Sequence, residues 1–161
     1  MKAKPFVPEY FDVKEVVELD EYVLKKLSVD DVELDYQAVM SSIDIIKKTR
    51  GGTSWPFPEM TLEFDRIDLC WHQTEFDYRC SFAYKISNLE KNKYLGCIYI
   101  YPPNKPWLEY PEGTDAVVNY WVTQEAYLEG LYPKVFKSLK KWIANDWPFH
   151  QVHYSNIEIP E

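Results

Sequence analysis

The feature that most constrains the fold is the stretch 116–143, in which an apolar segment is followed by an amphipathic one. Residues 117–122 are β-branched or aromatic apart from Asn119, as expected of a strand that is covered on both faces. From Leu131 onward the apolar residues recur every three or four positions, which is the spacing of one helix face. Pro133 fits the first turn of that helix, because the nitrogen at that position has no intrahelical partner to lose. The stretch therefore predicts a buried strand that leads into a helix beginning near residues 129–131.

The connection between this strand and this helix is a candidate ligand site. A helix N-terminus presents free N–H groups and the positive end of the helix dipole, which together can hold a phosphate. Gly130 stands at the start of the predicted helix. The alternative is an ordinary strand-to-helix connection without a ligand, and a single glycine does not decide between the two.

The segment 119–131, NYWVTQEAYLEGL, together with the preceding YLGCIYIYP, resembles the core of the GCN5-related N-acetyltransferase (GNAT) superfamily, in its ribosomal-protein-acetyltransferase-like branch. The pattern of that superfamily is an aromatic strand, a short loop, and Q/R-x-x-G-x-G/A opening a helix. Residues 120–122 match the strand, and Gly130 matches the second glycine. Glu125 stands at the Gln/Arg position, Leu128 replaces the first glycine, and Glu129 adds a negative charge. The order of elements resembles the superfamily from Tyr22 to Ser155.

This resemblance implies an α/β (α+β) fold of the GNAT acyl-CoA N-acyltransferase type, with a mixed, mostly antiparallel sheet flanked by helices and a shortened C-terminal part. The whole chain, 1–161, is expected to form one such domain, with residues 1–19 as an extended N-terminal arm. The implied function is an acetyl-CoA-dependent N-acetyltransferase, which moves the acetyl group by direct transfer to a small amine or a protein amino group. The alternative is a catalytically inactive binding or interaction module of the same fold, suggested by the altered glycine motif.

The resemblance also implies which residues would contact acetyl-CoA. The backbone N–H groups of Val122 and Thr123 would face the pantetheine arm, and those of residues 129–132 would face the pyrophosphate. The complete set of predicted cofactor-binding residues is Trp121, Val122, Thr123, Leu128, Glu129, Gly130, Leu131 and Tyr132.

Four further residues are candidates for the acceptor side of the site. In acetyltransferases of this type the segment between the first two helices lines the acceptor site, which makes Trp55 and Phe57 candidates for a substrate wall. The alternative for both is a loop that is merely held in place by its aromatic side chains. Asn119 is a candidate to hydrogen-bond the reacting amine, and Tyr154 is a candidate acid that returns a proton to the leaving thiolate.

Other reactive residue types are sparse. The histidines are too scattered for a Ser-His-Asp, Cys-His or zinc spacing, so no metal site is predicted. His72 lies near Asp68 and Glu75 at helical spacing, which suits either a base or a solvated helix surface. The three cysteines lack C-x-x-C spacing and lie in apolar-rich stretches, which predicts buried, reduced thiols in a cytoplasm.

Bulk properties limit the partners. The formal net charge of -8 argues against a general nucleic-acid binder, because phosphate contacts need clustered Lys and Arg. No apolar run is long enough for a membrane span and no signal peptide is recognisable, so a cytoplasmic protein without a membrane partner is expected. The aromatic share of 17% and the expected lack of a final hairpin suggest a homodimer.

The remaining elements follow from local patterns. Residues 22–27 predict a strand, a helix follows Asp30 or Asp31, and Thr61 is expected to cap another helix. Residues 81–87 and 94–101 predict a hairpin, and residues 150–154 predict a short last strand.

Overall fold

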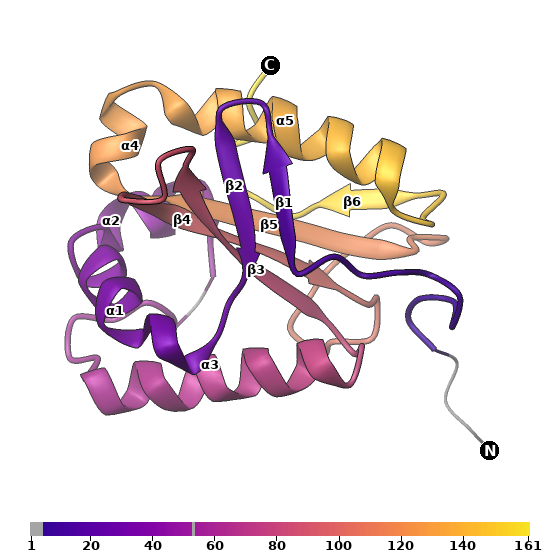
Figure 1. The fold of residues 1–161 in the computed structure, drawn as a ribbon, viewed down its shortest axis with the longest axis horizontal. Helices are drawn as coiled ribbons and strands as arrows, with labels where there is room; N and C mark the ends of the chain where they lie inside the picture. Colours follow the sequence, from indigo (N-terminus) through magenta and orange to yellow (C-terminus); the bar gives the residue numbers. More distant parts are fainter. Residues whose placement is uncertain (1–4, 53) are drawn as a thin grey trace.

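The computed structural model describes residues 5–52 and 54–161, and it consists of one six-stranded sheet between two layers of helices (Figure 1). The strands lie in the order β1-β2-β3-β4-β5-β6, and every neighbouring pair is antiparallel except β5 and β6, which are parallel. The predicted α+β class with a mixed, mostly antiparallel sheet is therefore confirmed. In chain order the elements are β1 (Val16–Leu19), β2 (Tyr22–Lys26), the 3-10 turn η1 (Val29–Asp31), α1 (Val32–Met40), α2 (Ile43–Thr49), α3 (Leu62–Asp77), β3 (Phe82–Asn88), β4 (Tyr94–Tyr101), β5 (Ala116–Val122), α4 (Gln124–Leu128), α5 (Leu131–Asp146) and β6 (Val152–Tyr154).

Strand β5 is covered on both faces, as its sequence predicts. All seven of its residues are buried. Val118, Tyr120 and Val122 join the core under α5, whereas Trp121 joins the core under α1, α2 and α3. Figure 1 shows α5 along one face of the sheet and α3 along the other. The period-2 alternation of a strand thus gives β5 one set of side chains for each face.

Helix α5 packs through the face that its three-to-four spacing predicts. Its buried residues include Val135, Leu139 and Trp142, and each fully buried apolar side chain contributes roughly 1.5–3 kcal/mol. Pro133 lies in the first turn, as expected. The prediction missed α4, a single short helix that precedes α5. Five residues are too few to show a helical period in the sequence.

The N-terminal arm differs in part from its prediction. Phe6 stacks on Phe82 and Phe149 with ring centroids 5.8 and 5.2 Å apart, so the arm lies over the body. Residues 16–19, however, form the edge strand β1, which pairs with β2 across a two-residue turn. Asp20 adopts a positive φ of 50° in that turn, a conformation that the sequence does not announce. Residues 1–4 of the predicted arm lie outside the described part.

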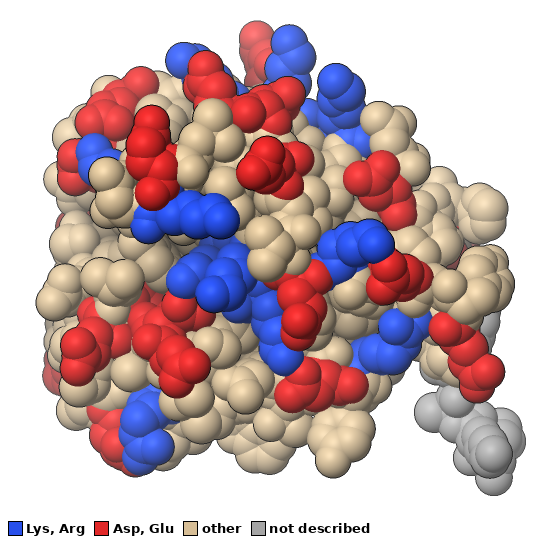
Figure 2. All heavy atoms as spheres, viewed as in Figure 1, with Lys and Arg blue, Asp and Glu red and all other residues tan. Residues whose placement is uncertain are grey.

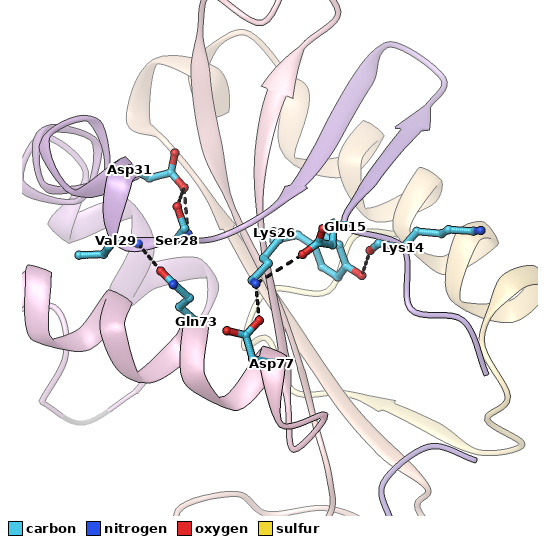
Figure 3. A network of polar contacts seen from close by, with 9 residues as sticks. Lys14, Glu15, Lys26, Ser28, Val29, Asp31, Gln73 and Asp77 are labelled. Atoms are coloured by element: carbon cyan, nitrogen blue, oxygen red, sulfur yellow. Dashed lines mark hydrogen bonds and ion pairs between the residues drawn. The ribbon is translucent and has the colours of Figure 1, made fainter. Parts of the chain in front are cut away.

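Helix α3 is fixed to the edge of the sheet by a polar network. Thr61 caps the helix as predicted, because its side chain accepts a hydrogen bond from the Phe64 N–H at 3.1 Å. The Val29 N–H donates to the Gln73 side chain at 2.9 Å. Figure 3 shows Lys26 between Glu15 and Asp77, its two ion-pair partners. These contacts hold α3 in a defined position beside β2, and α3 carries one wall of the site described below.

The surface charges and the thiols differ in how well they match the sequence. On the face shown in Figure 2, basic and acidic side chains are interspersed. None of the helices formed by residues 5–52 and 54–161 has the length and apolar content to span a membrane.

Cys97 is buried as predicted, but Cys70 and Cys80 are exposed, so the prediction of three buried thiols is wrong for two of them. Cys70 lies on the outer side of α3, and Cys80 lies in the turn after it.

Candidate functional site

The first part of the candidate site is the place where β5 and β6 diverge. The two parallel strands pair only from Ala116 to Val118. Beyond Val118, the side chain of Asn156 forms the hydrogen bonds to β5 that the backbone of a neighbouring strand would otherwise form. The Tyr120 N–H donates to Asn156 Oδ1 at 3.1 Å, and Asn156 Nδ2 donates to the Tyr120 carbonyl at 2.9 Å. The divergence therefore begins immediately after Val118 and is bridged by one buried side chain.

The connection from β5 to α5 is more tightly bonded than its sequence suggests. Thr123 caps α4, because its hydroxyl accepts from the Ala126 N–H at 3.2 Å. Its own N–H donates to the Leu95 carbonyl at 2.9 Å. The N–H groups of Glu129 and Gly130 donate to carbonyls of α4 at 3.1 and 3.0 Å. The prediction that the N–H groups of Thr123, Glu129 and Gly130 face a cofactor is therefore wrong, because the protein itself already engages them.

Three backbone donors near this connection remain for a ligand. Leu131 and Tyr132 begin α5, and no described residue accepts a hydrogen bond from their N–H groups. The third donor follows from the alternation of N–H directions along a strand. Thr123 donates toward β4 and Tyr120 donates toward Asn156, so the N–H of Val122 points to the Asn156 side. Gly130, which caps α5, has a φ of 82°, and a Cβ at this residue would meet no atom within 4 Å.

The charged and apolar side chains around this connection face solvent. Leu128 is 75% exposed, so its side chain is not part of the packing between β5 and β6. Glu125 and Glu129 both pair with Lys93, at 2.8 and 3.8 Å. Trp121 can contribute only its backbone here, because its indole N–H donates to the Tyr99 hydroxyl at 2.8 Å on the opposite face of the sheet.

The C-terminal segment 155–161 borders the start of α5. The Tyr132 hydroxyl donates to the Glu158 carbonyl at 2.6 Å, and the Glu158 N–H donates to the Thr49 carbonyl at 3.0 Å. A cavity of about 500 Å³ lies between this segment and the α4–α5 junction; its lining residues are Tyr127, Tyr132, Pro133, Glu158, Ile159, Pro160 and Glu161. The segment therefore forms one wall of the space next to the two free N–H groups.

The two predicted catalytic residues lie on opposite faces of the sheet. Asn119 accepts a hydrogen bond from Arg50 Nε at 3.0 Å and donates to the Ser155 hydroxyl at 3.1 Å, on the side of α2. Tyr154 pairs with Val118 in the strand register and packs against Phe136 of α5, with ring centroids 5.3 Å apart. Burial raises the pKa of Tyr154 to about 12. The structure does not bring these two side chains together.

The second part of the candidate site is a pocket of about 500 Å³ between α3 and β4. Trp55 lines this pocket, as the prediction of a substrate wall requires. Phe57 does not; it packs edge-on against Phe64 at 5.1 Å. The full lining is Arg50, Gly52, Ser54, Trp55, Phe64, Asp68, Trp71, His72, Glu75, Tyr99, Tyr101 and Trp107.

His72 belongs to this pocket rather than to a solvated helix surface. Its side chain is 14% exposed, and its Nε2 lies 3.6 Å from a carboxylate oxygen of Asp68. The His72 ring lies 5.2 Å from the ring of Tyr99. The alternative of a solvated surface is therefore wrong. The helical spacing of His72 and Asp68 was the sequence signal, but only the position of β4 shows which way the pair faces.

The inner end of the pocket reaches the central strand. The guanidinium carbon of Arg50 lies 5.2 Å from the Trp55 ring and 5.5 Å from the Tyr99 ring. Tyr99 stands opposite Asn119 in the register of β4 and β5, and Arg50 bonds to Asn119. The pocket thus ends at the level of Asn119. Sequence reasoning missed Arg50 and Tyr99, because nothing in the local pattern indicates that these two distant residues meet.

A buried carboxyl pair lies beneath the pocket. Asp35 of α1 and Asp65 of α3 are both buried. Burial, followed by the neighbouring Asp35, raises the pKa of Asp65 to about 9. Neither carboxyl oxygen of Asp65 has a hydrogen-bond partner among the described residues, and its raised pKa keeps it protonated at neutral pH, whereas Asp35 accepts a hydrogen bond from the Tyr94 hydroxyl. Within the described part of the chain, no three His, Cys, Asp or Glu side chains assemble as metal ligands.

The fold and this arrangement define the class: the chain has the fold of the GNAT acyltransferases. No protein-family model matches the chain, and no curated protein matches its sequence. Among solved structures, Mycobacterium smegmatis RimJ in complex with CoA-disulfide is similar with a TM-score of 0.65, at 10% identity over 86% of this chain and 66% of that one. RimL, a ribosomal L7/L12 alpha-N-protein acetyltransferase, in complex with coenzyme A has a TM-score of 0.61, at 15% identity over 81% and 68%. The ribosomal-protein-S5-alanine acetyltransferase from Vibrio fischeri has a TM-score of 0.57, at 16% identity over 82% and 67%.

Proposed function

We propose that the protein is an acetyl-CoA-dependent N-acetyltransferase that transfers the acetyl group directly to an amine. The observation that carries this proposal is the divergence of β5 and β6 beside the start of α5, with the N–H groups of Val122, Leu131 and Tyr132 left for a ligand. Two solved structures of the same fold are complexes with coenzyme A or its disulfide, which supports an acyl-CoA ligand here.

The residues present can bind acetyl-CoA through backbone N–H groups, although fewer of these groups are available than the sequence predicted. The N–H groups of Leu131 and Tyr132 and the dipole of the 16-residue α5 suit a pyrophosphate. Gly130 leaves the approach to them free of a side chain. Leu128 is exposed, and the carboxylate of Glu129 forms an ion pair with Lys93. Their predicted contacts with the cofactor would therefore come from exposed side chains and carbonyl groups. When bound, acetyl-CoA would supply the acetyl group as an activated thioester.

The chain's own groups have distinct proposed roles. The Val122 N–H is directed to polarise a carbonyl that lies between β5 and the C-terminal segment. Asn119 and Arg50 face the other side of the sheet, so the amine would approach from the pocket between α3 and β4. Tyr154 remains our candidate acid, because it lies on β6 beside the central strand, where it pairs with Val118 in the register. Trp55 would form part of the acceptor wall, and Phe57 would support it through Phe64.

The acceptor is proposed to be a small amine or a protein amino group. Two of the similar structures are described as acetyltransferases of ribosomal proteins, which supports a protein amine as one option. The net charge of -8 attracts cationic acceptors and repels nucleic acid. We place the protein in the cytoplasm, without a membrane partner. We also propose a homodimer, because Leu62 and Ile67 on α3 are exposed apolar side chains; sedimentation that gives a monomer at high concentration would contradict it.

A catalytically inactive binding module is the second candidate. It is favoured by the N–H groups of Thr123, Glu129 and Gly130, which the protein itself engages, and by the C-terminal segment beside α5. Calorimetric titration with acetyl-CoA and with CoA distinguishes the two, followed by release of free thiol with a library of amines. Binding with amine-dependent thiol release supports the transferase. Absence of binding at millimolar acetyl-CoA overturns it, and binding without thiol release favours the inactive module.

A further inference from the structure

The pocket between α3 and β4 has walls of an unusual composition. Aromatic side chains form much of it, with the exposed Trp71 on α3, the buried Tyr101 on β4 and the exposed Trp107 on the following loop among them. Tyr101 and Trp107 meet edge-to-face at 6.0 Å. The indole N–H of Trp55, also in the wall, is buried and has no acceptor among the described residues. Such walls favour a flat aromatic body, because aromatic rings pair in offset-stacked or edge-to-face arrangements with further aromatic rings.

The charges in the pocket are arranged for a single positive group. Glu75 is already paired with Lys105 at 3.1 Å. Asp68 has only His72 as its ion-pair partner among the described residues, and its side chain is 37% exposed. One carboxylate therefore remains to match one ammonium group. A second positive charge deeper in the pocket would meet the guanidinium of Arg50, which already lies over the rings of Trp55 and Tyr99.

The inner end has the groups that an amine needs to lose a proton. His72 and Arg50 both lie against Tyr99, and Tyr99 stands opposite Asn119 on the central strand. The positive charge of Arg50 favours the neutral form of a nearby amine. The Nε2 of His72 faces Asp68, so Nδ1 is the ring nitrogen left to accept a proton. The other ionisable groups around His72 are Glu75 on the same helix and Tyr101 on β4.

We propose, resting on the function proposed above, that this pocket is the acceptor site and that its acceptor is a primary amine carried on a flat aromatic body. The body lies among Trp71, Tyr101 and Trp107, and the amino group lies at the inner end beside His72. There the ammonium N–H bond breaks and an imidazole N–H bond forms, so the amine becomes neutral and His72 becomes positive. Polyamines and amino sugars lack a flat aromatic body to pair with these rings, so both should bind more weakly.

The proposal is tested by titrating the full chain, without acetyl-CoA, with phenethylamine, putrescine and glucosamine. Tryptophan fluorescence and calorimetry report the binding, because three tryptophans line the pocket. We expect phenethylamine to bind at least about ten-fold more tightly than the other two. Equal or tighter binding of putrescine or glucosamine overturns the substrate class.

Variants locate the binding. Trp71 is 64% exposed, so Trp71→Ala should fold, and it should weaken phenethylamine binding about five-fold or more. Asp68→Asn should weaken it about three-fold to five-fold. Glu63→Gln is the matched control, because Glu63 is on the same helix, pairs with Arg66 and does not line the pocket. If the Trp71 and Asp68 variants bind like the control, the pocket is not the acceptor site.

His72 is tested separately. His72→Gln should leave phenethylamine binding within about two-fold and lower kcat by about 100-fold, because a glutamine side chain cannot take the proton of the amine. A variant that keeps the full kcat contradicts the role of His72. The two proposals fail separately: acetyl-CoA binding without amine binding overturns this inference alone, and amine binding without acetyl-CoA binding overturns the transferase alone.

Discussion

At the scale of single residues, Asp65 is the side chain that is least like its solvated form. It is 0% exposed, neither of its carboxyl oxygens has a hydrogen-bond partner among the described residues, and the neighbouring carboxyl group of Asp35 adds to the rise of its pKa. Desolvation disfavours the charged form, which is why the folded-state pKa is about 9. An unfolded aspartic acid titrates near pH ~4. Between pH ~4 and about 9, Asp65 therefore holds a proton in the folded chain that it has released in the unfolded chain.

This proton makes stability depend on pH in a defined direction. Because the folded pKa is raised, the contribution to stability is complete below the unfolded pKa and is lost as pH rises toward about 9. The loss amounts to at most ~1.4 kcal/mol per pH unit. Asp65→Asn keeps the shape and a donor for Asp35, so it should raise the free energy of unfolding at pH 8 by roughly 1–3 kcal/mol and flatten its slope.

Urea unfolding of this variant from pH 5 to pH 9 checks the prediction. The exposed Glu63→Gln variant serves as the comparison, because Glu63 makes only a surface ion pair. It should follow the wild-type slope. If Asp65→Asn keeps the wild-type slope as well, the pair does not hold the proton that we assign to it.

At the scale of elements, the close approach of β4 and β5 depends on Gly96. A Cβ at this residue would lie 2.0 Å from the Trp121 carbonyl oxygen, and its φ is 153°. Gly96→Ala should therefore push the two strands apart at Val122 and cost about 2 kcal/mol or more. Gly130→Ala is the matched control, because its Cβ meets nothing and only the positive φ is strained, at about 1–2 kcal/mol.

Chemical denaturation of both variants measures this difference. In addition, Gly96→Ala should lower acetyl-CoA affinity, because it displaces the Val122 N–H. A Gly96→Ala protein that is as stable as the Gly130→Ala protein would show that the strands can adapt. In that case the close approach would not fix the position of the Val122 donor.

The connection between β5 and α5 carries a prediction about charge. Glu125 and Glu129 place two carboxylates on the α4 side of the free N–H groups of α5. Glu129→Gln should raise affinity for CoA about two-fold at low salt, because one negative charge is removed near the pyrophosphate. Calorimetry at low and high salt checks this, with Glu63→Gln as the control. An affinity that is unchanged at low salt would place the pyrophosphate away from α4.

The helices and strands could be predicted from the sequence where they are long enough to show the period of their apolar residues. The buried strand, the amphipathic helix from Leu131, the hairpin of residues 81–101 and the Thr61 cap all follow from local patterns. The sequence could not show α4, because a five-residue helix has no visible period. It could not show β1, because four residues are too few to show a clear strand period and the positive φ of Asp20 in the turn is not marked by a glycine.

The candidate site was less predictable than the elements. The loop position of Trp55 and Phe57 predicted both as an acceptor wall, and no local signal showed that only Trp55 lines the pocket between α3 and β4. Arg50, Tyr99 and Trp107 come from the end of α2, from β4 and from the loop after β4, and only the tertiary fold brings them into one pocket. The hydrogen bonds of Thr123 and Tyr120 depend on Leu95 and Asn156, which are distant in sequence. Contacts of this kind are set by tertiary structure.

At the scale of the whole molecule, the C-terminal segment controls access to the start of α5. Glu158 binds Tyr127, Tyr132 and Thr49, and it pairs with Lys48 at 3.5 Å. Deleting residues 158–161 should remove this wall and raise acetyl-CoA affinity roughly three-fold to ten-fold, because the binding-competent population grows. Calorimetry on the deleted and full chains measures the change. A fall in affinity, with stability unchanged, would mean that the segment contributes to binding instead.

The central claim is that the space between β5 and the C-terminal segment, at the start of α5, holds acetyl-CoA. The most direct measurement is an amide-resonance titration of the full chain with acetyl-CoA. We predict that the largest shifts occur at Val122, Leu131 and Tyr132, while amides around the four lysines of α5 change little. No shifts at millimolar acetyl-CoA, or shifts confined to the outer face of α5, would contradict the claim.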